Sequence, residues 1–120
     1  MRLVSYISDE GIRSAAVRDG RYVDLNATDP DLPVSVKQLL AQGPVGLERA
    51  RRAAERGESI DPQAVCLAAP VPDPEKVVCI GLNYADHAAE SGAEIPGEPV
   101  VFNKFPTAVC GPGAAVVLPN

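Results

Sequence analysis

The chain has 120 residues, a formal net charge of −5 and 46% hydrophobic residues. This length suits one domain, or a small domain with part of another. The mildly acidic balance, without a basic stripe, argues against nucleic-acid binding. The sequence contains no uncharged apolar run long enough to predict a membrane helix. It starts directly in a strand-like pattern, so we expect no signal peptide. We therefore expect neither a nucleic-acid nor a membrane partner.

The cysteines give a second, weaker constraint. Cys66, Cys79 and Cys110 are odd in number, widely spaced and set among apolar residues, with no Cys-x-x-Cys pair for zinc. We expect three reduced, mostly buried thiols in a cytoplasmic protein.

The first 25 residues predict a small antiparallel unit. Residues 2–7 and 12–18 are strand-like, and Asp19-Gly20 is a hairpin signal before the stretch Tyr22-Val-Asp-Leu. Residues 26–33 are expected to form a polar loop.

Two short helices and a closing strand are expected next. Val36, Leu39 and Leu40 have helical spacing, ended by Gly43 and Pro44. The second helix has its apolar residues between positions 47 and 54, and its charges are expected to form a solvated face. Residues 65–68 predict a closing strand. Residues 1–70 thus predict a small α+β domain in which nothing demands chemistry.

A change in composition marks a boundary near residue 70. Pro70, Pro72 and Pro74 alternate with other residues and favour an extended connector, and eight of the 12 prolines lie from Pro70 onward. We therefore divide the chain into residues 1–70 and residues 71–120. From Pro99 to the end only Lys104 is charged, and apolar strands of this kind need partners on both faces. We expect the chain to be the amino-terminal part of a longer protein.

The stretch from Val77 to Gly92 is the best candidate for chemistry. An apolar strand is expected to turn over Gly81 into a short helix carrying His87, the only histidine. Glu90 lies three residues later, on the same helical face, where a carboxylate can orient an imidazole that acts as a general base. The structural alternative is a half-exposed surface histidine with a helical neighbour.

Neighbouring residues have simpler explanations. Asn83 is a good helix N-cap, and Asp86 fits a capping-box position, so we expect both to be structural. A metal site made of His87, Glu90 and Asp86 alone is disfavoured because three groups on one helical turn rarely surround an ion.

Lys104 is the second candidate. It lies among apolar residues, where an unpaired ammonium is costly to bury, so it either reaches solvent or meets an anion.

The glycines do not indicate nucleotide binding. Gly111-Pro112-Gly113 predicts a turn, since no basic strand–loop–helix follows it. Gly81 lacks the further glycines of a dinucleotide fingerprint.

The order and spacing of these motifs resemble the fumarylacetoacetate hydrolase family. The resemblance rests on Cys79-Ile-Gly-Leu-Asn-Tyr-Ala-Asp-His-Ala-Ala-Glu-Ser-Gly, on Ile95-Pro-Gly-Glu-Pro-Val-Val-Phe-Asn-Lys-Phe-Pro-Thr-Ala and on Gly111-Pro-Gly. It runs from about Val71 to Pro119, and the residues before it are similar to the variable amino-terminal domain of the family. The implied fold is an α+β amino-terminal domain followed by the start of a mixed β-rich catalytic fold, which this chain leaves incomplete.

The resemblance implies a metal-dependent hydrolase, isomerase or lyase acting on small 2-oxo or enolisable acids such as acylpyruvates. His87 and Glu90 are the implied catalytic dyad, and Lys104 is the implied partner of the anionic oxo-acid substrate. Mg²⁺ or Mn²⁺ is the implied cofactor, with its carboxylate ligands expected downstream of residue 120 and none among the residues named above. The full-length protein is expected to be a homodimer, and the 120 residues alone are expected to be inactive.

Two other interpretations of the sequence stay open. A chain that ends at Asn120 would be an inactive remnant or an interaction module of the same fold. A nucleotide-binding α/β domain is the third possibility and requires glycines that this sequence lacks.

Overall fold

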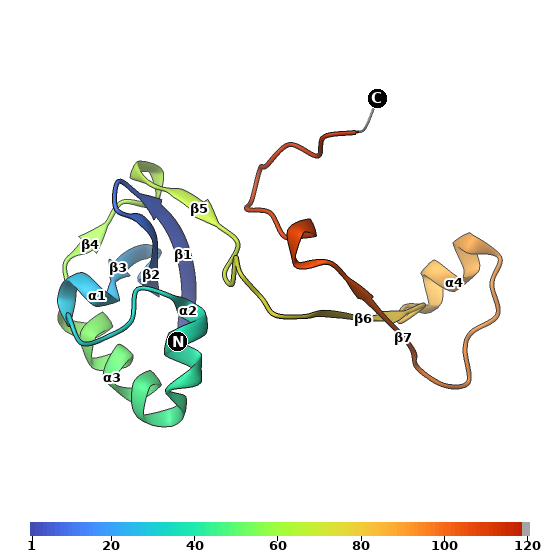
Figure 1. Ribbon diagram of the computed structural model, residues 1–120, viewed down its shortest axis with the longest axis horizontal. Helices are drawn as coiled ribbons and strands as arrows, with labels where there is room; N and C mark the ends of the chain where they lie inside the picture. Colours follow the sequence, from blue (N-terminus) through green and yellow to red (C-terminus); the bar gives the residue numbers. More distant parts are fainter. Residues whose placement is uncertain (119–120) are drawn as a thin grey trace. The chain divides into compact units, whose positions relative to one another are not determined.

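The computed structural model describes residues 1–118 (Figure 1). The chain divides into two compact units. The N-terminal unit comprises Met1–Asp73 together with the segment from Val109 onward, and the hairpin unit comprises Pro74–Ala108. The assignment of domains to residues 1–70 and 71–120 stays a prediction, and the return of the chain to the N-terminal unit at Val109 was not foreseen.

The N-terminal unit contains a five-stranded antiparallel sheet in the order β4-β3-β2-β1-β5. Its strands are β1 (Arg2–Ser8), β2 (Gly11–Arg18), β3 (Arg21–Asp24), β4 (Ser59–Ile60) and β5 (Cys66–Ala68). Asp19 and Gly20, between β2 and β3, have φ values of 50° and 75°. Positive φ at both positions is what a two-residue hairpin turn requires, so the predicted hairpin is confirmed.

Three helices and a 3₁₀ turn complete this unit: α1 (Leu25–Thr28), α2 (Val36–Ala41), α3 (Gly43–Arg56) and η1 (Pro62–Ala64). The loop predicted for residues 26–33 is wrong at its start. There the Asp24 side chain caps α1 by accepting a 2.7 Å hydrogen bond from the Ala27 amide. Gly43 and Pro44 begin α3 instead of merely ending α2, because a first-turn proline loses no helical hydrogen bond.

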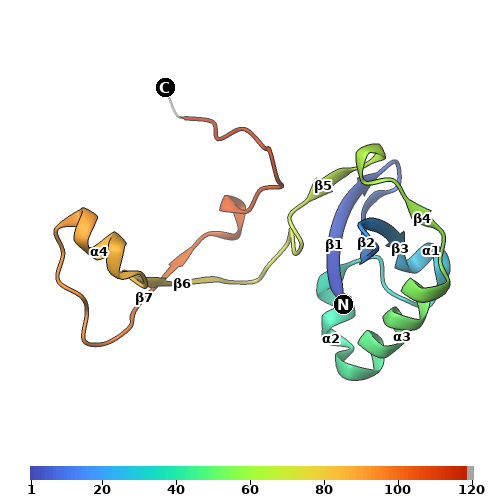
Figure 2. The same cartoon turned by 180° about the vertical axis from the view of Figure 1, so that it is seen from behind.

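The core of the N-terminal unit lies between the sheet and these helices, which gather beside the strands in both views (Figures 1 and 2). The buried cluster consists of Ala16, Leu25, Leu32, Leu39, Ala50, Ala53 and Ala54, with Leu3 packed against it. Alanines form the buried face of α3, and small side chains allow a helix to approach its neighbours closely. The charged residues of α3 are exposed, as predicted.

The hairpin unit is an antiparallel pair of strands with one helix and a 3₁₀ turn. It contains β6 (Val77–Gly81), α4 (Ala85–Ser91), β7 (Val100–Lys104) and η2 (Pro106–Ala108). The register pairs Gly81 with Val100 and Val77 with Lys104. Taken together, the two units form a mixed α/β structure with antiparallel sheets.

Two predictions about individual segments have different outcomes. Cys66 and Cys110 are exposed and Cys79 is half-buried, so the prediction of mostly buried thiols is wrong. The turn predicted at residues 111–113 is confirmed by a 3.2 Å hydrogen bond from the Ala114 amide to the Gly111 carbonyl and by φ of 75° at Gly113. Among residues 1–118, no helix has the length and apolar character needed to span a membrane.

Candidate functional site

The turn after β6 sets the direction of α4. Leu82 follows Gly81 with φ of 49°, a left-handed conformation that is uncommon for a residue other than glycine. Tyr84 is the N-cap of α4 and makes no side-chain cap, so the prediction of Asn83 as N-cap is wrong. Asp86 accepts a 2.8 Å hydrogen bond from the His87 amide and so satisfies a helix amide, as predicted. It does so from the first turn, without a capping-box partner.

His87 and Glu90 both lie on α4, and both are exposed. Their spacing of three residues places them on the same side of the helix. No hydrogen bond or ion pair found in residues 1–118 joins the two side chains. The hydrogen bonds between His87 and neighbouring side chains involve its backbone: its amide donates to Asp86, and its carbonyl accepts a 2.8 Å bond from Ser91 Oγ. The structure thus brings the two residues to one helix face without forming the dyad, and their catalytic role stays a prediction.

Lys104 lies at the other end of the hairpin from α4. It pairs with Val77, four residues along β6 from Gly81, which corresponds to about 13 Å of strand. Its side chain is exposed in the described chain, so no ammonium is buried. The argument that burial would require an anionic partner therefore does not apply. The hairpin therefore does not bring Lys104 to His87, and its substrate-binding role also stays a prediction.

A small cavity borders the turn that leads into α4. It has a volume of about 260 Å³ and is lined by residues 80–83 on one side and 96–99 on the other. Asn83 and Glu98 are the polar side chains in this lining. Glu98 was not selected by the sequence reasoning, although it stands as a lone acid between glycine and proline. The cavity is smaller than the range of about 300–1,000 Å³ of typical ligand pockets, so these residues alone do not enclose a substrate.

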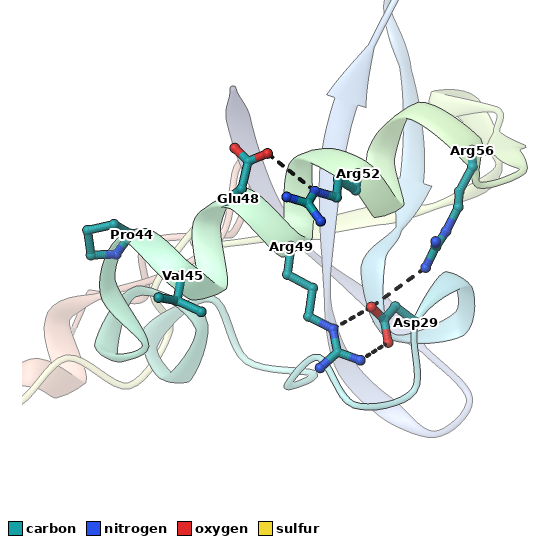
Figure 3. Close-up of a pocket in the computed structure, with 7 residues that line it drawn as sticks. All are labelled: Asp29, Pro44, Val45, Glu48, Arg49, Arg52 and Arg56. Atoms are coloured by element: carbon teal, nitrogen blue, oxygen red, sulfur yellow. Dashed lines mark hydrogen bonds and ion pairs between the residues drawn. The ribbon is translucent and has the colours of Figure 1, made fainter.

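A larger cavity, of about 720 Å³, lies along α3 in the N-terminal unit (Figure 3). Arg49 donates to both carboxylate oxygens of Asp29, at 2.6 and 2.7 Å, and Arg56 lies 3.7 Å from the same carboxylate. Arg52 lies 3.4 Å from Glu48. The hydrogen bonds from Arg49 hold the pKa of Asp29 below its usual value. Each arginine in the lining thus faces a carboxylate, which fits the predicted solvated face of α3.

A second buried carboxylate, that of Asp24, belongs to a cluster in the N-terminal sheet. Asp24 accepts hydrogen bonds from Tyr6, at 2.5 Å, and from Arg13 Nε, at 2.6 Å. Burial alone would raise the pKa of Asp24, but the bonds from Arg13, from the Ala27 amide and from Tyr6 outweigh it and lower that pKa. Burial and the Asp24 carboxylate raise the pKa of Tyr6 to about 12. Because every member has a partner, this cluster has a structural explanation and needs no catalytic one.

Within residues 1–118, no group of three or more His, Cys, Asp or Glu side chains could hold a metal ion. The side chains present therefore do not form the Mg²⁺ or Mn²⁺ site that the sequence resemblance implies. The ligands predicted downstream of residue 120 lie outside the described residues.

Comparison with known proteins places this chain among relatives. Residues 76–120 match the family described as fumarylacetoacetate (FAA) hydrolase C-terminal. Over its whole length the chain is 36% identical to the mitochondrial oxaloacetate tautomerase fahd2 of Xenopus laevis, of which it covers 39%. Over 83% of its length it is 45% identical to the human mitochondrial oxaloacetate tautomerase FAHD2A, of which it covers 32%. The chain therefore spans between about a third and two fifths of the length of these relatives.

A solved structure has a fold similar to that of this chain. The crystal structure of a Mycobacterium smegmatis protein assigned as HpcE superimposes with a TM-score of 0.73 and 27% identity, over 98% of this chain and 41% of that one. The prediction of a cytoplasmic location is wrong by this comparison, because the Xenopus laevis and human relatives are mitochondrial proteins. The match over residues 76–120, the identities over nearly the whole chain and the shared fold agree: residues 76–120 carry part of a fumarylacetoacetate hydrolase family domain.

Proposed function

We propose that this chain is part of an enzyme that interconverts the keto and enol forms of a small 2-oxo dicarboxylic acid of the oxaloacetate class. The observation that supports this most is the identity of 36% and 45% to proteins named oxaloacetate tautomerases. Because the chain spans less than half of those proteins, the activity is proposed for a protein that also contains the remaining part of the domain.

The reaction needs a base at carbon and a donor at oxygen. Tautomerisation removes a proton from the carbon beside the oxo group and places a proton on the oxo oxygen. A neutral imidazole is the side chain best suited to accept that proton near neutral pH. His87 is the one imidazole of the chain, and its exposure on α4 leaves the ring open to a substrate. Glu90, on the same helix face, would orient the ring and stabilise the imidazolium.

Lys104 would bind a substrate carboxylate. Its ammonium is exposed, so a dianionic acid can reach it without a prior cost of burial. Because Lys104 lies about 13 Å of strand from the Gly81 turn, we expect it to contribute to substrate affinity and not to the proton transfer.

A second candidate is hydrolysis of a carbon–carbon bond in an acylpyruvate. The hydrolase family match over residues 76–120 favours it. In that reaction His87 would take a proton from water, and the hydroxide would attack the distal carbonyl. The bond from that carbonyl carbon to the neighbouring methylene would break, and the imidazolium would return its proton to the enolate carbon to give pyruvate. The two candidates share the base and the anionic substrate, and they differ in whether a bond is cleaved.

The test compares variants of the protein expressed from its complete natural reading frame. Tautomerisation would be measured as the loss of the ultraviolet absorbance of the enol form of oxaloacetate. Hydrolysis would be measured as the release of pyruvate from an acylpyruvate. We expect His87→Ala to lower kcat by about 10²–10⁴-fold and Glu90→Gln to lower it less. Glu94→Gln, an exposed acid beyond α4, is the matched control and should leave kcat unchanged.

Each result has a defined meaning. An unchanged kcat in His87→Ala would remove His87 as the base. Pyruvate release without tautomerisation would replace the first candidate by the second. Turnover by residues 1–120 alone would contradict the expectation that this part is inactive by itself.

A further inference from the structure

The proline-rich connector is held to the N-terminal unit at two points. Ser5, on β1 and only 2% exposed, donates a 2.8 Å hydrogen bond from its hydroxyl to the Pro70 carbonyl. Lys37, on α2, donates a 3.0 Å hydrogen bond to the Asp73 carbonyl and lies 3.6 Å from the Asp73 carboxylate. Ala69, directly before the first of these points, is buried. The connector thus follows the surface of the N-terminal unit as far as Asp73.

The sequence of the connector suits this arrangement. Proline has no backbone N–H, so Pro70 and Pro72 present only carbonyl acceptors, and their rings keep the chain extended. An extended segment of this kind binds best to side chains that donate. Ser5 and Lys37 are two donors, and they reach the connector from a strand and a helix that are far from it in sequence.

The chain is held again where it returns to the N-terminal unit. A Cβ atom added at Gly111 would lie 2.9 Å from the Leu67 carbonyl oxygen and 3.3 Å from the Ala68 Cα. The backbone of residue 111 therefore lies directly against β5, at a distance that a larger residue cannot adopt without moving one of the two segments. The turn at Pro112 and Gly113 then directs the chain onward, closed by the hydrogen bond from the Ala114 amide to the Gly111 carbonyl.

We propose that the N-terminal unit is a clamp for the two segments that connect it to the hairpin unit. Ser5 and Lys37 hold the outgoing segment, residues 69–73, and the contact of Gly111 with β5 holds the returning segment, residues 109–113. The clamp fixes the backbone on both sides of residues 74–108, the part that carries His87. This inference does not depend on the proposed enzymatic reaction.

The test is ¹⁵N relaxation of the 120-residue chain. We expect the amides of Val71, Asp73 and Gly111 to have order parameters near the value of about 0.85 that is typical of rigid backbone. Lys37→Met should lower the order parameters of Val71 and Asp73 toward about 0.6 and leave that of Val23, in the core, unchanged. Lys76→Met, a lysine just beyond the connector, is the matched control and should change neither amide.

The returning segment is tested with a pair of glycines. Gly111→Ala should shift the amide resonances of Leu67 and Ala68. Gly97→Ala should not, because a Cβ at Gly97 meets nothing within 4 Å. Order parameters below about 0.6 at Val71 and Asp73 in the unsubstituted chain would overturn the proposal. So would a Lys37→Met chain that matches Lys76→Met, or a Gly111→Ala chain that matches Gly97→Ala.

Discussion

The N-terminal unit and the hairpin unit differ in how completely they bury their apolar residues. In the N-terminal unit, leucines and valines such as Leu39 and Val23 are fully buried, and they pack between a sheet and helices. In the hairpin unit the apolar residue that is fully buried is Ala88, whereas Val101 is 64% exposed and Phe105 is 78% exposed. These are values for residues 1–118.

The difference separates the residues that form the core from the residues that are predicted to be catalytic. The residues that are predicted to be catalytic lie on the hairpin unit, which has little core of its own. The buried charge cluster lies in the N-terminal unit, where each member has a partner. Buried area supplies most of the free energy of folding, so the N-terminal unit should carry most of the stability of this chain. Three predictions test this comparison, in order of decreasing effect.

The largest effect is expected for Asp24→Ala. This substitution removes the cap of α1 and leaves the guanidinium of Arg13 without its buried partner. Loss of one member of a buried ion pair costs about 3–5 kcal/mol. Thermal unfolding followed by circular dichroism should show a large drop in the midpoint. Glu10→Gln is the control, because Glu10 pairs with the same Arg13 but its side chain is 80% exposed, and it should change stability by less than about 1 kcal/mol. Equal effects of the two substitutions would contradict a buried role for Asp24.

A matched pair of valines compares the two units directly. Val23→Ala removes two buried carbon atoms in β3 and should cost about 2 kcal/mol, from lost burial and the cavity left behind. Val101→Ala makes the same change on a strand of the hairpin unit and should cost less than about 0.5 kcal/mol. Urea unfolding of both variants measures the difference. A cost for Val101→Ala as large as that for Val23→Ala would show that the hairpin strands are packed in solution.

The smallest expected effect is the pH dependence of stability that the same buried cluster causes. This effect is small near neutral pH and grows at acid and alkaline pH. The pKa of Asp24 is lower in the folded than in the unfolded chain, so its stabilisation is complete above the unfolded value of about 3.9 and is lost as the pH falls below it. The pKa of Tyr6 is raised to about 12, so its neutral form stabilises the fold below about pH 10 and this contribution is lost as the pH rises toward 12.

Melting temperatures measured across this pH range check both directions. Tyr6→Phe should remove the alkaline loss, and Tyr84→Phe, at a residue that is 70% exposed, should leave it in place. An alkaline loss that persists in Tyr6→Phe would assign it to another group.

Local patterns were sufficient to predict much of the fold. The strand-like character of residues 2–7 and 12–18, the Asp19-Gly20 turn and the helical spacing of Leu39 with its neighbours are local features of the sequence, and the structure confirms them. The family was also readable, because the order and spacing of the motif around His87 are specific.

The predictions that were wrong depend on contacts that are distant in sequence or on details of capping. Asp24 begins a helix where a loop was predicted, since its carboxylate is held by Arg13 from another strand as well as by the Ala27 amide. The exposure of Cys66 and Cys110 depends on what lies beside β5 and the Gly111 turn, which no local window describes.

The sequence by itself determined the secondary structure of the first hairpin, and it predicted the class of chemistry and the residues that would perform it. Only the tertiary structure decided that the side chains of His87 and Glu90 are exposed and not bonded to each other, and that Lys104 lies at the far end of the hairpin. It also showed that the connector and the Gly111 turn are held by the N-terminal unit. The physical reason is that periodicity encodes which face of an element is apolar, whereas register and long-range hydrogen bonds arise only when separate elements pack together.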